Sequence, residues 1–70
     1  MYRYYCIMRP PMPGAVPYIK GNHWEGRTFT ERRYIPEIER MAWGWVEYEI
    51  PLTPAEIADY ELIAAPREDE

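Results

Sequence analysis

Eight prolines divide this chain of 70 residues, and they limit most strongly what it can fold into. Proline has no backbone N–H, so it cannot donate to a sheet ladder or to the interior of a helix. Four of the prolines surround Gly14 in the stretch PPMPGAVP, which predicts a long, stiff loop over residues 10–17. The other four stand apart, and strands or helices are expected to begin or end near Pro36, Pro51, Pro54 and Pro66.

Four segments between the prolines have the aromatic and β-branched composition of strands: residues 2–9, 28–35, 42–50 and 60–66. Side chains alternate between the two faces of a strand. In the first segment the uncharged face is expected to point inward, and it consists of Tyr2, Tyr4, Cys6 and Met8. The third segment alternates most clearly: Ala42, Gly44, Val46, Tyr48 and Ile50 share one face, opposite Trp43, Trp45, Glu47 and Glu49.

The stretch LTPAEI carries the signals of a helix start. Thr53 suits the N-cap, Pro54 suits the first helical position, and Glu56 completes a capping box with Thr53. Leu52 and Ile57 have the spacing of a hydrophobic staple across this start. The helix is expected to be short, because strand-like residues follow it at once.

Together these elements predict an α+β fold: a small antiparallel or mixed β-sheet of three to four strands, one short helix and the long proline-rich loop. We place a single domain at residues 1–66 and expect the acidic tail, residues 67–70, to be frayed. A domain of this size buries only roughly 60% of its unfolded surface, so its core is thin. Three Trp, seven Tyr and one Phe supply the large side chains that such a core needs.

The cysteine content and the hydropathy pattern indicate the compartment. Cys6 is the only cysteine, so no disulfide can form within the chain. No apolar run approaches the roughly 20 residues of a spanning helix, and the first residues lack the apolar centre of a signal peptide. We therefore expect a cytoplasmic protein with no membrane association.

The net charge of −4 is distributed unevenly. Residues 1–46 hold seven basic and four acidic side chains, whereas residues 47–70 hold one basic and eight acidic side chains. Affinity for DNA depends on neutralising phosphates. Nucleic acid is therefore an unlikely partner for the chain as a whole, and the acidic half is expected to meet a basic partner or the basic half of the same chain.

The reactive side chains do not form a site in the sequence. Cys6 lies on the apolar face of a predicted strand, which indicates an inert thiol rather than the nucleophile of a pair with His23. A structural zinc site needs about four Cys or His ligands, and the chain holds one of each. The glycine-rich stretch GNHWEG lacks the residues of a phosphate-binding loop. We expect no catalytic residue, no metal site and no cofactor, and hence no enzyme.

Two short patterns have both a binding and a structural interpretation. RPPMP has the Pro-x-x-Pro spacing that aromatic grooves recognise, although a stiff crossing loop explains it equally. Arg32 and Arg33 lie near Phe29 and Tyr34, as in platforms for single-stranded nucleic acid. Glu31 in the same strand favours a solvated face instead.

Trp43 and Trp45 are the strongest candidates for a functional surface, with Glu47 and Glu49 beside them. If exposed, two adjacent indoles form a patch of the size that marks an interaction site. Alternatively, the proline loop folds over them with Met12, Val16 and Tyr18 and makes them part of the core. The sequence favours the covered arrangement and leaves open that at least one indole contacts a protein partner.

The runs YRYYCIMRPPMPGAVP and YIPEIERMAWGWVEYEIPLTPAEIADYELIAAP resemble short uncharacterised proteins carried by conjugative or phage-like mobile elements of gram-positive bacteria. The resemblance implies an accessory role in the life of a mobile element, directed against host defence, and assigns no functional residue. The leading hypothesis is a non-catalytic protein–protein interaction module with an unknown protein partner. The alternative is an acidic nucleic-acid mimic or nucleic-acid-associated regulator. A homodimer is compatible with either, because edge strands and aromatic side chains favour self-association.

Overall fold

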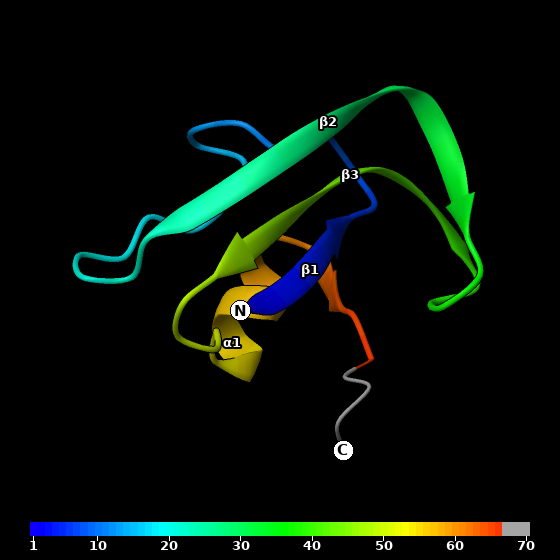
Figure 1. Cartoon of the computed structure of the whole chain (residues 1–70). Helices are drawn as coiled ribbons and strands as arrows, with labels where there is room; N and C mark the ends of the chain where they lie inside the picture. Colours follow the sequence, from blue (N-terminus) through cyan, green and yellow to red (C-terminus); the bar gives the residue numbers. More distant parts are fainter. Residues whose placement is uncertain (67–70) are drawn as a thin grey trace.

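The computed structural model describes residues 1–66 and contains one antiparallel sheet with a short helix beside it (Figure 1). The strands are β1 (Tyr2–Cys6), β2 (Trp24–Ile35), β3 (Arg40–Tyr48) and β4 (Leu62–Ala64), and the helix is α1 (Pro54–Asp59). The strand order in the sheet is β2-β3-β1-β4, so β2 and β4 are its edges. The tail expected at residues 67–70 lies outside the described residues.

The α+β prediction is wrong, because the structure is a small β-rich fold. The capping box at Thr53 forms as predicted, with both of its hydrogen bonds present. However, α1 has six residues and buries none of them completely. Glu61 has a φ of 55° just after the helix and turns the chain into β4. A helix this short contributes little to the core, which the antiparallel sheet dominates.

The strand bounds differ from the predicted ones mainly at the loops. β1 ends at Cys6, before the exposed Met8 and Arg9. β2 begins four residues earlier than expected, at Trp24, because its first residues pair with the end of β3. The ambiguous segment after Pro36 is the turn of the β2–β3 hairpin, where Glu39 has a φ of 55°.

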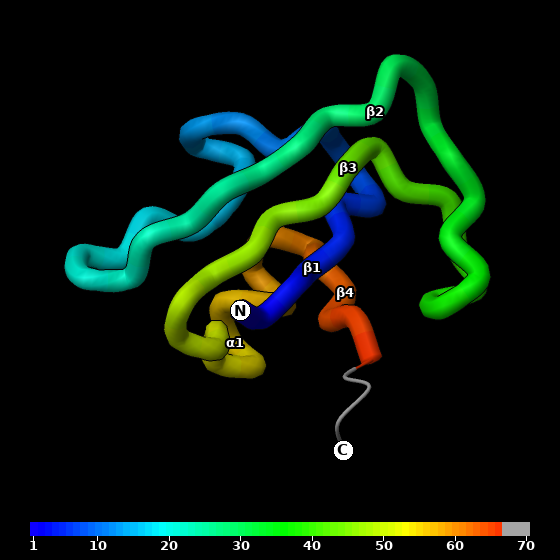
Figure 2. Tube along the Cα trace, viewed as in Figure 1, coloured from blue at the N-terminus to red at the C-terminus, as the bar shows by residue number. Residues whose placement is uncertain are grey.

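The β2–β3 ladder contains a large irregularity. Thr28 pairs with Gly44 and Arg33 pairs with Ala42, so four residues of β2 face the single residue Trp43. Excess residues of this kind bend a strand and increase its local twist. Figures 1 and 2 show β2 turning sharply within its length, so that the far end of the hairpin curls down beside the rest of the sheet. Both parts of the hairpin are paired with β3, the near part along residues 44–48 and the far part along residues 40–42, and the far part leans over one face.

One face of the sheet packs against α1 and the proline loop. Its buried residues form a cluster of Tyr4, Cys6, Val16, Val46, Tyr48, Leu52 and Leu62. The Tyr48 hydroxyl donates a hydrogen bond to the carbonyl oxygen of Pro17, and the Tyr4 hydroxyl accepts one from the Leu52 N–H at 2.8 Å. Burial raises the pKa of the Tyr48 hydroxyl, so it remains a protonated donor to the loop. Two buried hydroxyls thus attach the loop and the α1 connection to the strands.

The proline loop covers the opposite face from the one expected. Val16 belongs to the Val46 and Tyr48 cluster, not to the side of Trp43 and Trp45. Met12 and Tyr18, the other residues expected to cover the indoles, are 51% and 85% exposed. Gly44 explains the choice of face, because its missing side chain leaves room for Pro11. The loop packs where the sheet has no side chain in its way.

The far part of the hairpin covers the second face. Tyr5, Ile35 and Ala42 form a buried cluster there, against which Phe29 and Trp45 also pack. The Tyr5 hydroxyl donates to Glu37 Oε2 across 3.4 Å. Tyr5 was expected on the outer side of β1, and it is buried because the bent hairpin reaches over it. Ile50, expected on the same strand face as Val46 and Tyr48, lies beyond the end of β3 and is 54% exposed.

A buried asparagine connects the loop before β2 to the segment after β3. Asn22 is 5% exposed, and its amide makes two hydrogen bonds with the backbone of Ile50. Nδ2 donates to the Ile50 carbonyl at 2.9 Å, and Oδ1 accepts from the Ile50 N–H at 2.8 Å. The side chain thus continues the strand pairing beyond the last backbone pair and closes this end of the sheet.

We expect Gly44→Ala to destabilise the fold. A Cβ at this position would collide with the Arg27 carbonyl oxygen and lie 2.8 Å from Pro11 Cδ. Overpacking of this kind costs about 1–3 kcal/mol of unfolding free energy. Urea denaturation followed by tryptophan fluorescence measures the loss, with Lys20→Ala on the exposed surface as control. Equal stability of the glycine variant and the control would show that the loop does not sit tightly on β3.

We expect Asn22→Ala to cost about 1–3 kcal/mol, because the Ile50 N–H and carbonyl lose their partner in a partly buried position. The same denaturation experiment measures this loss. The neighbouring exposed residue provides a matched control, His23→Ala, which should leave the stability unchanged. A normal midpoint for the asparagine variant would contradict the proposed closing role of its amide.

Candidate functional site

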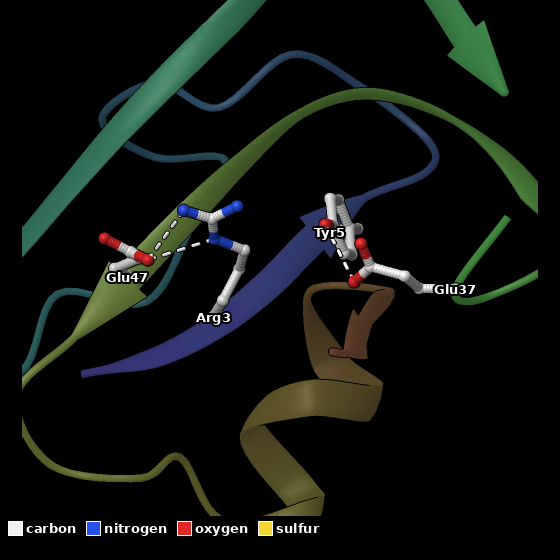
Figure 3. A network of polar contacts seen from close by, with 4 residues as sticks. All are labelled: Arg3, Tyr5, Glu37 and Glu47. Atoms are coloured by element: carbon white, nitrogen blue, oxygen red, sulfur yellow. Dashed lines mark hydrogen bonds and ion pairs between the residues drawn. The ribbon is translucent and has the colours of Figure 1, made fainter. Parts of the chain in front are cut away.

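Trp45 lies on the face that the proline loop leaves uncovered, and its indole is half-buried. The guanidinium carbon of Arg3, on the neighbouring strand β1, lies 4.2 Å from the indole centroid. The same guanidinium forms an ion pair with Glu47, in which Arg3 Nη2 lies 2.8 Å from Glu47 Oε2 (Figure 3). Arg3 is therefore held between a ring and a carboxylate, and its charge is neutralised by Glu47.

Trp43 is also half-buried, and the guanidinium carbon of Arg32 lies 5.7 Å from its ring centroid. Glu49 lies one residue beyond β3, where it is exposed and its backbone N–H donates to the His23 carbonyl at 3.2 Å. Neither predicted interpretation of the tryptophans describes this arrangement fully. Each indole is partly covered, and an arginine rather than the proline loop lies over it.

A hollow of about 360 Å³ opens between Trp45 and the bent part of β2. We call it the arginine hollow, and its lining residues are Arg3, Arg27, Thr28, Phe29, Thr30, Arg33 and Trp45. Strands β1 and β3 supply its floor, because Arg3 and Trp45 lie on adjacent strands. β2 supplies Arg27 and Thr28 before the irregularity, Phe29 and Thr30 within it, and Arg33 just after it. The bend that covers Tyr5 therefore also shapes the hollow.

The arginine hollow carries positive charge that the fold does not neutralise. Among residues 1–66 the ion pairs are Arg3–Glu47 and Arg9–Glu61, so Arg27 and Arg33 have no carboxylate partner there. The guanidinium carbon of Arg33 lies 4.6 Å from the Phe29 centroid, which holds it beside an aromatic ring. Thr30 adds a hydroxyl to the lining. The hollow thus combines two free guanidinium groups, hydroxyls and rings.

Sequence reasoning identified Trp45 and Glu47 but missed most of this site. The sequence pattern linked Arg33 with Arg32, yet Arg33 lies over the Phe29 ring and Arg32 lies over the Trp43 ring. Arg3 and Arg27 gave no signal, because a local pattern does not show which strands become neighbours. Within the Pro-x-x-Pro stretch Pro11 is buried beside Gly44, whereas Pro13 is exposed.

Cys6 and His23 are not brought together. Cys6 is 2% exposed within the first core cluster, and burial raises the pKa of its thiol to about 11. His23 is exposed and precedes Trp24, which pairs with Tyr48, whereas Cys6 pairs with Gly44. The two pairing positions on β3, Gly44 and Tyr48, are four positions apart, which is about 13 Å along the strand. The thiol is thus protonated at neutral pH and distant from the imidazole.

Two further searches concern residues 1–66 alone. No cluster of three or more His, Cys, Asp or Glu side chains that could hold a metal ion occurs in this part of the chain. Within the same residues, no helix has the length and apolar character needed to cross a membrane.

Comparisons with known proteins relate the chain to a phage protein. The family model for the Defence against restriction A C-terminal region matches residues 1–67. A curated relative, the Defense against restriction protein A of Escherichia phage P1, is 36% identical over 70 residues, which cover 97% of this chain and 10% of the relative. The chain thus spans about a tenth of that protein's length. No solved structure matches.

These matches confirm the expected likeness to proteins of phage-like mobile elements. The expected gram-positive origin finds no support, because this relative comes from a phage of Escherichia. The match extends over nearly all of the strands and loops described above, including every residue that lines the arginine hollow. The chain belongs to the Defence against restriction A C-terminal family.

Proposed function

We propose that this chain is a non-catalytic, cytoplasmic binding module of a mobile element, and that it helps the element's DNA survive host restriction. In this role the arginine hollow is the contact surface for a macromolecular partner. The observation that supports it most directly is a pair of guanidinium groups, Arg27 and Arg33, that form no ion pair within residues 1–66 and lie at a concave place beside two aromatic rings. Family membership supplies the process, since the relative is named for defence against restriction.

A binding role accounts for how the arginines are held. Arg33 is placed against Phe29 and Arg3 against Trp45, so their side chains are partly ordered before any partner arrives. Preorganised side chains lose less conformational entropy on binding. Arginine and tryptophan are also the residue types that dominate the energetics of protein interfaces. The hollow therefore has the composition of a recognition site.

The absence of catalysis in this proposal is supported by the state of the chain's reactive groups. The Cys6 thiol is buried with a raised pKa, whereas nucleophilic cysteines are accessible and have a lowered pKa. The only imidazole, that of His23, is exposed on a turn away from the arginine hollow. Arginines alone can position a ligand and stabilise its charge, but they do not transfer protons at neutral pH.

The alternative function, an acidic mimic of nucleic acid, is not favoured by the geometry. A mimic needs regularly spaced, unpaired carboxylates on one surface. Glu47 and Glu61 are engaged in ion pairs with Arg3 and Arg9. Glu37 lies on the bent hairpin, away from Glu47 and Glu61, and accepts a hydrogen bond from Tyr5. The arginine hollow is basic instead.

The proposal is tested by transferring the encoding element into restricting and non-restricting hosts. The measured quantity is the efficiency of transfer into the restricting host divided by that into the non-restricting host. We expect the double variant Arg27→Gln/Arg33→Gln to lower this ratio by about tenfold or more, because each lost charged hydrogen bond weakens binding by about 1.5–3 kcal/mol. The control Arg40→Gln removes one arginine charge outside the hollow and should leave the ratio unchanged. Equal ratios for the double variant and the wild type, with both proteins folded, would refute the role of the hollow.

A further inference from the structure

We propose that the arginine hollow binds a phosphate group of single-stranded nucleic acid, with the adjoining base against its aromatic side. This inference rests on the proposed function and names the ligand of the same site. The charges come from Arg27 and Arg33, which form no ion pair with another described residue, and the hydroxyl of Thr30 is available to donate a hydrogen bond. Arginine forks match the geometry of phosphate oxygens.

The division of charge within the hollow fits one phosphate group. Arg3 is neutralised by Glu47 and stacked on Trp45, so it serves as part of the platform rather than as a free cation. Arg27 and Arg33 enter from either side of the β2 irregularity and face the same hollow. The hydroxyl of Thr28 is already donated to the Pro11 carbonyl at 3.4 Å, which leaves Thr30 as the free hydroxyl of the lining.

The size of the hollow favours a single strand over a duplex. Its volume of about 360 Å³ is at the lower end of the roughly 300–1,000 Å³ of small-ligand pockets. A space of this kind accommodates one nucleotide unit, whereas a duplex presents its bases inside and offers only a broad backbone surface. The net charge of −4 over the whole chain also opposes a long contact with a polyanion.

The rings distinguish a nucleic acid from an acidic protein as the occupant. A carboxylate-rich segment would account for Arg27 and Arg33 but leaves Phe29 and Trp45 without a role. Bases of single strands stack on aromatic side chains and on arginine planes, and both are present here in the Arg3–Trp45 and Arg33–Phe29 pairs. A nucleotide thus uses every kind of group in the lining.

This inference departs from the expectation, based on net charge, that nucleic acid is an unlikely partner. Net charge describes the field far from the molecule, whereas a short ligand within the hollow meets mainly the groups that line it. At an ionic strength of about 0.1 M, interactions between exposed charges are screened beyond about 10 Å. The acidic side chains of α1 and its flanks, Glu56 and Asp59, do not line the hollow.

The test is a titration of the full chain with an oligothymidylate of eight nucleotides. Tryptophan fluorescence reports the binding, and the titration is repeated at several salt concentrations. We expect quenching and a slope of log K against log salt of about −0.7, as for one neutralised phosphate charge on a single strand. Arg27→Gln and Arg33→Gln should each weaken binding, and the double variant should bring the slope close to zero. Arg40→Gln should bind as the wild type does, and Trp45→Phe should weaken binding without changing the slope.

Three outcomes would overturn the inference. The first is no binding of the oligothymidylate at low salt by a chain whose near-UV circular dichroism shows it folded. The second is tighter binding of a duplex of the same length. The third is a preference for an oligoglutamate of equal charge, which would identify an acidic protein as the occupant. If the arginines still matter for restriction in the host assay while the oligonucleotide fails to bind, the proposed function stands and the ligand assignment falls.

Discussion

Between Thr28 and Arg33, β2 has three more residues than the part of β3 that it faces, and a paired strand can absorb such an excess only by bending. The second core cluster and the candidate site both follow from this bend. It brings Ile35 and Ile38 over Tyr5, so that a second cluster closes on a face that a flat sheet would leave open. It also moves Phe29 and Arg33 to a position beside Trp45, where they line a hollow with Arg3. Stability and the candidate site thus depend on one irregular ladder.

The two faces of the sheet are covered by different means, which is how so short a chain makes a core. The proline loop and α1 cover the face of Val46 and Tyr48, and the chain's own hairpin covers the face of Tyr5. Aromatic side chains provide much of the buried volume, and their hydroxyls also find partners: Tyr48 at Pro17 and Tyr4 at Leu52. Tyrosine suits this architecture because it fills space and anchors a loop with the same side chain.

What the sequence could predict was local. The alternation of Ala42, Gly44, Val46 and Tyr48 against the indoles is present in β3, and the capping box at Thr53 forms as its spacing requires. Both depend on residues within a few positions of each other. The side covered by the proline loop could not be predicted, because it depends on Pro11 meeting Gly44 across some thirty positions of sequence.

The hollow was unpredictable for a related reason. Its members come from three strands, and the register of β2 shifts within its length, so a local pattern does not show that Arg27 and Arg33 lie beside Arg3 and Trp45. The helix was correctly expected to be short, but the α+β class was wrong because a helix of six residues with none buried adds little to a core that the sheet supplies. Here Glu61 takes a left-handed backbone conformation almost at once and returns the chain to the sheet.

The position of β2 at the border of the sheet has one more consequence. Twelve residues of regular, unpaired edge would offer a template on which further copies could add strand upon strand, as in fibrils. The irregularity divides that edge into two shorter runs that point in different directions. This geometry disfavours aggregation, because intermolecular sheet growth from the border is interrupted after a few residues.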